Sequence, residues 1–397
     1  MEPAITHFKR HFGHEPLHVA QAPGRLELLG NHTDYNAGLV MAIAVDKYIW
    51  FAAAPRTDGK VKLVAAAFRD PVEFFPNDLQ KNPAAPWADY VKGVIDQLQR
   101  RGVHVGGFNA AIDGTIPMGA GMSSSAAIEV ATALAIRRLY PFSLRNGASA
   151  PPPQPDAQGE LQPLASREKM EFAKLCQLAE NEFVGVKCGL LDQASSLFGK
   201  AHHAIELDFQ GLTVEHAPMV GEIAIVTCNS GVKHELTGGE YNELRALCES
   251  AAKKLGAQFL RSVDRKHLLA NRARFTEREY QCAYHVVGEI QRVVHGASAL
   301  RAHDFEQFGQ FMFQSHESSR DFFKNSTREL DLLVSIAREH PSCLGARLTG
   351  GGFGGATINL VRQDRLEDFC GFMTHQYKQQ SGIDMSPLVC QIVDGAS

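Results

Sequence analysis

A glycine-serine loop that leads into a helix is the feature that most constrains this chain. Residues 108–113 (FNAAID) alternate in the manner of a strand, the loop PMGAGMSSSAA follows at 117–127, and good helix formers then continue to Pro141. Gly119 and Gly121 allow the backbone to approach a ligand closely, and the N–H groups of a first helical turn have no partners within the helix. Strand, loop and helix in this order predict a phosphate-binding cradle.

This loop differs from the known lysine-containing phosphate loop. The pattern G-x-x-x-x-G-K-S/T needs a lysine that is missing here, and the chain has neither the H-R-D nor the D-F-G string of protein kinases. On spacing alone, a glycine-rich turn closed by a serine N-cap stays open as an alternative. Three consecutive serines exceed what one cap needs, so we expect Gly119, Gly121, Ser123 and Ser124 to bind phosphate.

A second glycine-rich segment, TGGGFGG, lies at 349–355. Gly350, Gly352 and Gly355 satisfy the dinucleotide pattern G-x-G-x-x-G, which requires a helix to follow. The next residues, ATINLV, alternate between apolar and polar side chains as a strand does. We therefore expect this loop to join two strands at a hairpin or at the edge of a site.

Two further segments concentrate polar side chains. GRLELLGNHTDYN at 24–36 places Arg, Asn, His and Asp in a glycine-bounded loop between two predicted strands, an arrangement suited to the hydroxyl groups of a sugar but also typical of a solvated turn. Residues 179–193 bring several carboxylates and a lysine to the end of a predicted helix at 167–183. They could hold a metal or act as a base, or form an ordinary helix terminus.

The length of 397 residues predicts two domains, with a boundary near residue 205. The stretch 146–166 is rich in Pro, Ala, Gln and Gly and has little to bury, so it is predicted to be a surface insertion. Both halves mix strands and helices, with a strand near 221–229. Further helices are predicted at 240–255, 276–296, 304–320 and 326–339.

Composition excludes several classes of protein. Forty basic against 44 acidic side chains give a net charge of -4, so nucleic acid is not expected as a partner. The longest uncharged apolar stretch, 37–45, is too short to cross a membrane, and no secretory signal precedes it, so we expect a cytoplasmic protein without membrane contact. The eight cysteines lie at least twelve positions apart, which excludes C-x-x-C sites and favours reduced thiols.

Taken together and in this order, the three motifs resemble those of the GHMP kinase family. The family signatures are GR-x-N-L-I-G-E-H-T-D-Y-N, P-x-G-A-G-L-S-S-S-A-A and T-G-G-G-F-G-G, and the matching segments span residues 24–355. The resemblance implies an α+β, two-domain fold: an N-terminal domain over 1–205 similar to domain 2 of ribosomal protein S5, and a ferredoxin-like domain over 206–397. It also implies an ATP-dependent sugar-1-kinase that phosphorylates the anomeric hydroxyl of galactose.

The resemblance further implies roles for individual residues. Asp192, in CGLLDQ, matches the catalytic aspartate that takes or orients the proton of the sugar hydroxyl, and Arg25 matches the arginine beside it. Ser125 and Glu180 match positions that bind Mg²⁺, the implied cofactor. The positions implied to contact the sugar are Asn31, His32, Asp34, Gly189 and Tyr241.

Two departures from the family pattern leave the sugar open. Members that phosphorylate galactose carry Asn and then Glu where this chain has Glu27 and Asn31. A glutamate at position 31 would repel a carboxylate at C6, whereas the NH₂ group of Asn31 could donate to it, so galacturonate is an alternative substrate, as are L-arabinose and N-acetylgalactosamine. A non-catalytic sensor of sugar and ATP is a further alternative. The expected partners are only these small molecules, and the chain is expected to be a monomer or a weak oligomer.

Overall fold

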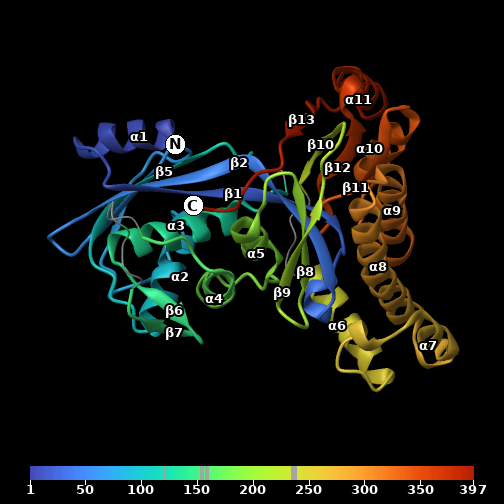
Figure 1. Ribbon diagram of the computed structural model, residues 1–397, viewed down its shortest axis with the longest axis horizontal. Helices are drawn as coiled ribbons and strands as arrows, with labels where there is room; N and C mark the ends of the chain where they lie inside the picture. The colour runs from blue at the N-terminus through green and yellow to red at the C-terminus, as the bar shows by residue number, and fades with distance from the viewer. Residues whose placement is uncertain (118, 120, 153–155, 157–160, 234–238) are drawn as a thin grey trace.

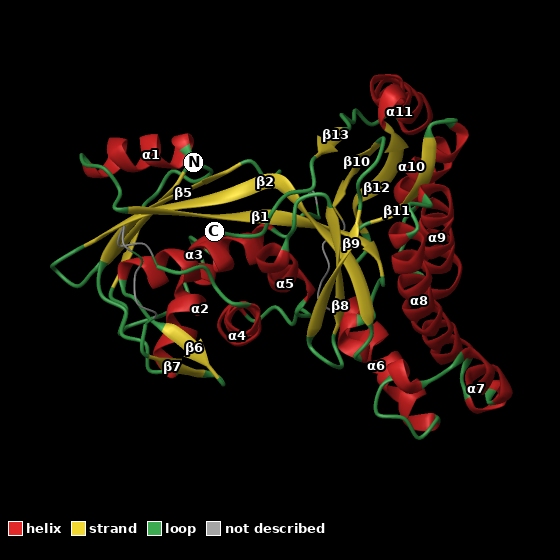
Figure 2. Cartoon of the chain, in the orientation of Figure 1, coloured by secondary structure: helices red, strands yellow, loops and turns green. Residues whose placement is uncertain are grey.

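The computed structural model describes residues 1–117, 119, 121–152, 156, 161–233 and 239–397. Figures 1 and 2 show two lobes, each built from a β-sheet with helices packed against it. The first lobe holds the N-terminal strands, and the second holds the long C-terminal helices. Within the described residues, no helix combines the length and the apolar character that crossing a membrane requires.

The first lobe is organised around a seven-stranded sheet with β2 at its centre. Its strands are β1 (His18–Leu29), β2 (Leu39–Pro55), β3 (Val61–Ala65), β4 (Val72–Phe74), β5 (Phe108–Gly114), β8 (His203–Asp208) and β9 (Thr213–Pro218). β2 pairs with β1, β5 and β8, and only the pairing of β3 with β5 is parallel. β2 can serve as the shared strand because its apolar side chains are buried along most of its length.

Helices cover both faces of this sheet. α1 (Glu2–Phe12) lies on one face, and the other side carries α2 (Trp87–Arg100), α3 (Ser124–Leu139), α4 (Ser166–Leu178) and α5 (Leu191–Phe198), as Figure 1 shows. α3 packs on β1 and β2 and is buried on almost every side. The predicted strand, loop and helix around the glycine-serine loop are therefore confirmed, and the start of α3 is held firmly against the sheet.

The insertion predicted at 146–166 is not entirely irregular. Its first residues form a hairpin in which β7 (Ala148–Ala150) pairs with β6 (Ser143–Arg145). Asn146 and Gly147, at the turn, both have positive φ angles, 53° and 76°, as a two-residue type I′ hairpin requires. The Asn-Gly pair was a signal for this turn in the sequence. Residues 153–155 and 157–160 of the insertion lie outside the described residues.

The second lobe contains a four-stranded sheet in the order β11, β12, β10, β13. These strands are β10 (Ile223–Lys233), β11 (Cys343–Leu348), β12 (Gly354–Arg362) and β13 (Leu388–Cys390). The helices are α6 (Gly239–Lys254), α7 (Arg265–Ala270), α8 (Glu277–Arg301), α9 (Phe305–Ser318), α10 (Arg328–Glu339) and α11 (Leu366–Ser381). The four helices and the strand predicted here are confirmed to within a few residues. A capping box of Thr276 and Glu279 starts α8, the longest of them.

Sheet membership changes later in the chain than residue 205. That position falls inside β8, and the first sheet continues through β9 to Pro218 before Ile223 begins β10. The two lobes are also not independent, because one hydrophobic cluster contains residues of both sheets and of α8 and α9. The C-terminal residue returns to the first sheet, where Ser397 and Gln21 exchange two backbone hydrogen bonds of 2.8 and 3.0 Å.

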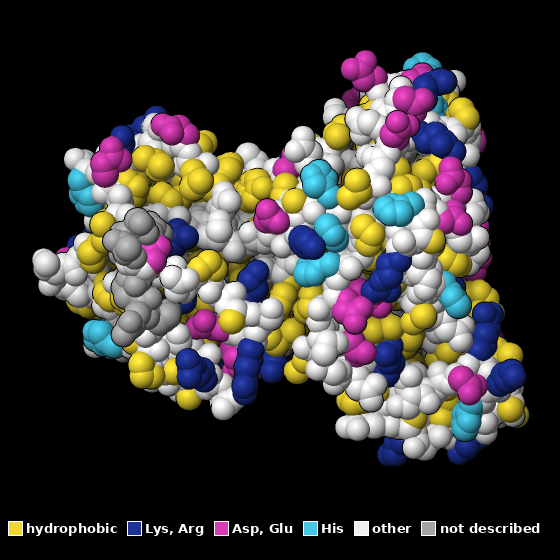
Figure 3. All heavy atoms as spheres, in the orientation of Figure 1, with side chains coloured by type: hydrophobic (Ala, Val, Ile, Leu, Met, Phe, Trp, Pro, Cys, Tyr) yellow, Lys and Arg dark blue, Asp and Glu magenta, His cyan; other side chains and the backbone are white. Residues whose placement is uncertain are grey.

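Charged side chains of both signs are interspersed on the face shown in Figure 3, most clearly over the C-terminal helices. Some of them form pairs between elements: Arg301 of α8 contacts Glu206 and Glu215 at 2.8 and 2.9 Å. This mixture agrees with the nearly balanced composition of the chain. All eight cysteines are unpaired thiols.

Candidate active site

Two adjoining cavities of about 460 and 470 Å³ lie where the lobes meet. The first cavity is lined by every residue predicted for catalysis and sugar contact, namely Arg25, Asn31, His32, Asp34, Gly189, Asp192 and Tyr241. The second cavity is lined by the predicted phosphate ligands and by Ser125, that is Gly119, Gly121, Ser123, Ser124 and Ser125. Arg25, Gly350 and Gly351 line both cavities. A ligand in one cavity would therefore lie next to a ligand in the other.

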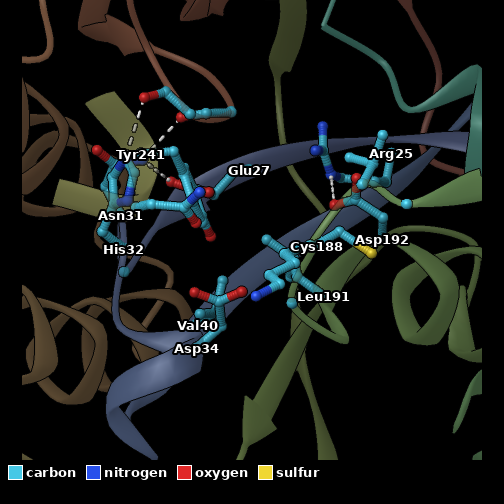
Figure 4. Close-up of a pocket in the computed structure, with 18 residues that line it drawn as sticks. Arg25, Glu27, Asn31, His32, Asp34, Val40, Cys188, Leu191, Asp192 and Tyr241 are labelled. Atoms are coloured by element: carbon cyan, nitrogen blue, oxygen red, sulfur yellow. Dashed lines mark hydrogen bonds and ion pairs between the residues drawn. The ribbon is translucent and has the colours of Figure 1, made fainter. Parts of the chain in front are cut away.

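Arg25 and Asp192 face each other at one end of the first cavity, as Figure 4 shows. The Nε of Arg25 donates to Oδ1 of Asp192 at 2.7 Å, and its Nη1 donates to the carbonyl of Gly121 at 2.6 Å. The hydroxyl of Ser123 donates to the other carboxylate oxygen, Oδ2, at 2.5 Å. Arg25 is nearly buried, whereas 24% of the Asp192 side chain is exposed toward the cavity. A pair of this kind can keep a carboxylate oriented toward a hydroxyl group.

The local structure around Arg25 explains how this arrangement forms. The sequence 24–36 was expected to be a loop, but β1 continues to Leu29, so Arg25 and Glu27 lie on a strand. A Cβ atom at Gly24 would be only 2.8 Å from the carbonyl oxygen of Met122, so glycine is needed for β1 to approach the phosphate loop. On the other side, the first turn of α5 carries Asp192, where the helix dipole favours a negative charge.

The loop before α3 is open toward the second cavity. Gly119 and Gly121 have positive φ angles of 72° and 69°, and Ser123, the N-cap of α3, has a φ of 55°. Ser123 does not cap the helix with its side chain, because its hydroxyl bonds Asp192 instead. The first-turn N–H groups of α3 consequently remain available to an anion. Met118 and Ala120 of this loop lie outside the described residues.

The second glycine-rich loop forms the opposite wall of this cavity. Residues Thr349–Gly355 line it, and the loop joins β11 to β12. The dinucleotide interpretation is excluded because a strand follows these glycines, as the sequence predicted. A Cβ atom at Gly352 would lie 2.2 Å from the carbonyl oxygen of Asn325, so only glycine fits the close approach there.

Ser125 and Glu180 lie together behind Asp192. Glu180 belongs to a π-helical turn, Ala179–Val184, that ends α4 earlier than the predicted helix at 167–183. It accepts hydrogen bonds from Ser125 and from Gln193, the latter at 3.0 Å. Burial raises the pKa of Glu180 to about 7, and the charge of Asp192 adds to this effect.

These two side chains fit Mg²⁺ better than they fit a metal whose ligands all come from the protein. Among the described residues, no three His, Cys, Asp or Glu side chains are grouped to hold a metal. Mg²⁺ commonly takes one or two protein oxygens and completes its shell with substrate phosphates and water. The hydroxyl of Ser125 lines the anion cradle, and Glu180, which is buried and lines neither cavity, would add a carboxylate to such a partial set of oxygens.

Asn31 lies at the other end of the first cavity and is 1% exposed. Its Nδ2 donates to Oε1 of Glu27 at 3.0 Å and to the carbonyl of Gly350 at 2.7 Å, and its Oδ1 accepts from Asn325 at 2.8 Å. Both amide hydrogens are therefore used within the protein. The prediction that the NH₂ group of Asn31 donates to a sugar carboxylate is thereby disfavoured, because these partners compete for the same hydrogens.

The neighbouring Glu27 forms a buried ion pair with Arg347 of β11, with Oε1 and Nη1 2.9 Å apart. The two side chains are 5% and 0% exposed. Burial raises the pKa of Glu27, while the positive charge of Arg347 opposes this rise. Together with Asn31, this pair ties β1 of the first lobe to β11 of the second.

His32 and Tyr241 form an aromatic wall. The Nε2 of His32 donates to the carbonyl of Gly351 at 3.0 Å, and its Nδ1 accepts from the hydroxyl of Tyr35 at 3.0 Å. Burial lowers the pKa of His32 to about 4, so the ring is neutral near pH 7. Tyr241, at the start of α6, has its ring centre 5.2 Å from that of His32.

Asp34 points into the same cavity next to Gly189. A Cβ atom at Gly189 would lie 1.5 Å from Oδ2 of Asp34, so glycine at this position leaves the space that the carboxylate occupies. Burial raises the pKa of Asp34 to about 6, and the charges of Glu27 and Asp192 also raise it. The carboxylate is mostly ionised at pH 7 and can accept hydrogen bonds from a ligand.

Sequence reasoning missed the residues that support this site from the second lobe. Arg347, Asn325 and Glu289 all bond the segment that contains Glu27 and Asn31. They lie about 260 to 320 positions away in the chain, and no local pattern marks them. The one available signal was Glu27 itself, since a carboxylate in an apolar strand requires a cationic partner.

Comparison with known proteins identifies the class of this fold. The model of the GHMP kinase N-terminal domain matches residues 89–151, and the model of the GHMP kinase C-terminal domain matches 297–379. The crystal structure of the Methanococcus jannaschii mevalonate kinase shares the fold, with a TM-score of 0.61 over 95% of this chain and 98% of that one at 18% identity. The two family models and this fold thus define the GHMP kinase class. The predicted α+β fold, S5-like in the N-terminal domain and ferredoxin-like in the C-terminal one, is confirmed.

More similar proteins narrow this class. A galactokinase from Chloroflexus aurantiacus is 39% identical over 98% of this chain and 95% of its own length, and one from Bos taurus is 37% identical over 98% and 94%. The crystal structure of Lactococcus lactis galactokinase complexed with galactose has a TM-score of 0.89 at 31% identity, covering 99% of this chain and 98% of that one. The model of the galactokinase galactose-binding signature matches residues 6–55. The chain belongs to the galactokinase family.

Proposed function

We propose that this protein transfers the γ-phosphoryl group of ATP to the anomeric hydroxyl of galactose. The anomeric oxygen forms a bond to the γ-phosphorus while the bond from that phosphorus to the β–γ bridging oxygen breaks, and the hydroxyl loses its proton. The products are galactose 1-phosphate and ADP. One observation carries the proposal: Arg25, hydrogen-bonded to Asp192, lines both the first cavity and the phosphate cradle.

Asp192 is the group that accepts or orients the proton of the hydroxyl. Arg25 holds one carboxylate oxygen and Ser123 holds the other, so the carboxylate is fixed in direction. The guanidinium of Arg25 also stabilises the negative charge on the transferring group. Because a proton is taken only while phosphorus is attacked, correct orientation contributes more than strong basicity.

The ATP phosphates bind in the second cavity. Gly119, Gly121, Ser123 and Ser124 surround them, and the start of α3 contributes its N–H groups. Ser125 and Glu180 would hold Mg²⁺, which neutralises phosphate charge and fixes the γ-phosphoryl group. The lysine that this loop lacks is replaced by the helix dipole and Arg25.

The sugar binds in the first cavity, with Asn31, His32, Asp34, Gly189 and Tyr241 around it. A neutral sugar suits this end, because the hydrogens of Asn31 are used internally and the carboxylate of Glu27 lies next to it. Galactose is therefore favoured over galacturonate. The monomeric or weakly oligomeric state and the cytoplasmic location remain predictions of the sequence.

A coupled assay of ADP release with ATP and Mg²⁺ tests the proposal. The panel is galactose, N-acetylgalactosamine, glucose, L-arabinose and galacturonate. We expect turnover of galactose and none of galacturonate. A preference for another sugar would refute the substrate, and absence of turnover with every sugar would instead support a non-catalytic sensor.

A further inference from the structure

Hydrogen bonds from helix α8 of the second lobe fix the backbone of the segment Gly30–His32, which lines the first cavity. One carboxylate oxygen of Glu289, on α8, accepts hydrogen bonds from the backbone N–H of Gly30 at 2.9 Å and of Asn31 at 2.8 Å. The same oxygen accepts from the hydroxyl of Ser315, on α9, at 2.9 Å. Glu289 is fully buried and does not line either cavity.

His285 contacts the backbone carbonyl of Asn31. It lies one helical turn before Glu289, and its Nε2 is 3.3 Å from the carbonyl oxygen of Asn31. Since a carbonyl only accepts, the ring carries its hydrogen on Nε2, and Nδ1 accepts from the hydroxyl of Ser318 at 2.9 Å. The N–H and the C=O of Asn31 are therefore both fixed by α8.

A stack of aromatic rings extends the contacts of α8 to His32. The ring of Phe323 lies between the two histidines, with its centre 4.4 Å from that of His285 and 4.6 Å from that of His32. The side chain of His32 in turn faces the cavity beside Tyr241. Contacts from α8 thus reach both residues of the segment whose side chains line the cavity.

The segment needs this support because its backbone is in an unfavourable conformation. Gly30 has a φ of 96°, and a Cβ atom there would lie 2.5 Å from the carbonyl oxygen of Leu39. His32 has a φ of 60°, in the left-handed region that is unfavourable for a residue with a side chain. Such a backbone persists only where its surroundings over-determine it.

Glu289 acts here as an anion. Burial alone would raise the pKa of Glu289, but nearby positive charge, above all that of Arg292, lowers it to about 2. The Nε of Arg292 lies 2.5 Å from the carboxylate oxygen that the backbone does not use. A charged acceptor strengthens the hydrogen bonds from both N–H groups.

We propose that Glu289 and His285 are positioning residues for the acceptor sugar, holding Asn31 and His32 from the second lobe in the conformation that binds it. This inference rests on the proposed function. It predicts that loss of these contacts weakens sugar binding and leaves in place the part of the phosphate cradle that the glycine-serine loop and the start of α3 form.

The test is steady-state kinetics of Glu289→Gln, with galactose and ATP varied separately. The glutamine keeps the shape, loses the charge and brings an NH₂ group to a site that contains mainly donors. We expect the KM for galactose to rise at least about tenfold, as when a charged hydrogen bond is lost, and the KM for ATP to stay within about twofold. His285→Gln is expected to change the same parameter in the same direction, and it carries the test if Glu289→Gln does not fold.

Asp89→Asn is the matched control. Asp89 is also a buried carboxylate paired with a cation three residues later in its helix, Lys92 at 3.0 Å, but it lies on α2 away from the first cavity. It should lower stability and leave the KM for galactose unchanged. The proposal is overturned if the folded variants keep the parent KM for galactose, or if both KM values rise equally. A parent protein that does not phosphorylate galactose would instead refute the proposed function.

Discussion

The two ends of the first cavity are built in opposite ways. At the Asp192 end, Arg25, Ser123 and Asp192 come from β1, the start of α3 and α5, all in the first lobe, and the carboxylate is partly open to the cavity. At the Asn31 end, Asn31 and Glu27 are almost completely buried and are held by Arg347 and Glu289 of the second lobe.

This difference teaches which properties each end controls. A buried polar network is stable only when all its members are paired, so a change at the Asn31 end should affect stability and sugar binding together. The Asp192 end is small and in contact with the cavity, so a change there should affect the rate with little effect on folding. The predictions below are ordered from the largest expected effect to the smallest.

The substitution Asp192→Asn tests the catalytic contribution of the Asp192 end most directly. We expect kcat to fall about 10²–10⁴-fold, because the amide cannot take a proton, while calorimetry shows galactose binding close to that of the parent. Asp208→Asn, at a surface pair with Arg261, is the control and should keep full activity. A variant of Asp192 as active as the parent would remove its catalytic role.

The substitution Arg347→Met disrupts the buried ion pair at the Asn31 end of the cavity. The carboxylate of Glu27 would then be buried without its cation, and we expect the free energy of unfolding in urea to fall by about 3–5 kcal/mol. Arg301→Met removes a partly exposed arginine with two acidic partners and should cost at most about 1 kcal/mol. Equal losses in the two variants would show that the buried pair has no special importance.

The pH dependence of sugar binding tests Asp34, which lies between the two ends. Its carboxylate, with a pKa of about 6, is ionised above that pH and protonated below it. Galactose affinity measured without ATP should therefore fall about tenfold from pH 7 to pH 5. His32 does not titrate in this range, because its pKa is about 4. Asp34→Asn should bind weakly with a flat profile, and an unchanged slope in that variant would assign the titration to another group.

The smallest effect is expected for Ser125→Ala, which removes one neutral oxygen from the proposed metal site. The Mg²⁺ concentration for half-maximal activity should rise roughly three- to tenfold, comparable to the loss of one hydrogen bond. Thr132→Ala, further along α3, removes a hydroxyl that bonds only the helix backbone and serves as the control. Unchanged dependence on Mg²⁺ would take Ser125 out of the metal site.

Local signals predicted most of the site. The glycine-serine loop predicted β5, the cradle and α3, and the alternation after TGGGFGG predicted β12 rather than a helix. The hairpin at 146–147 and the π-helical turn that carries Glu180 were missed, the first because the composition of the insertion was given more weight than its Asn-Gly pair. Seven of the residues that line the first cavity were assigned through the resemblance to the GHMP kinase family, which rests on the three motifs together and not on any one of them.

The sequence alone determined the elements and the residue types of the reaction, because strand alternation, helix formers and glycine positions act over a few neighbours. Only the tertiary structure decided what those residues can do. In the folded protein the hydroxyl of Ser123 bonds Asp192, and both amide hydrogens of Asn31 are used inside the protein. Arg347 reaches β1, and Glu289 reaches the segment directly after it, from far along the chain. A buried polar group must be paired wherever it lies, and the partner is selected by distance in space, which the chain acquires only when its two lobes pack together.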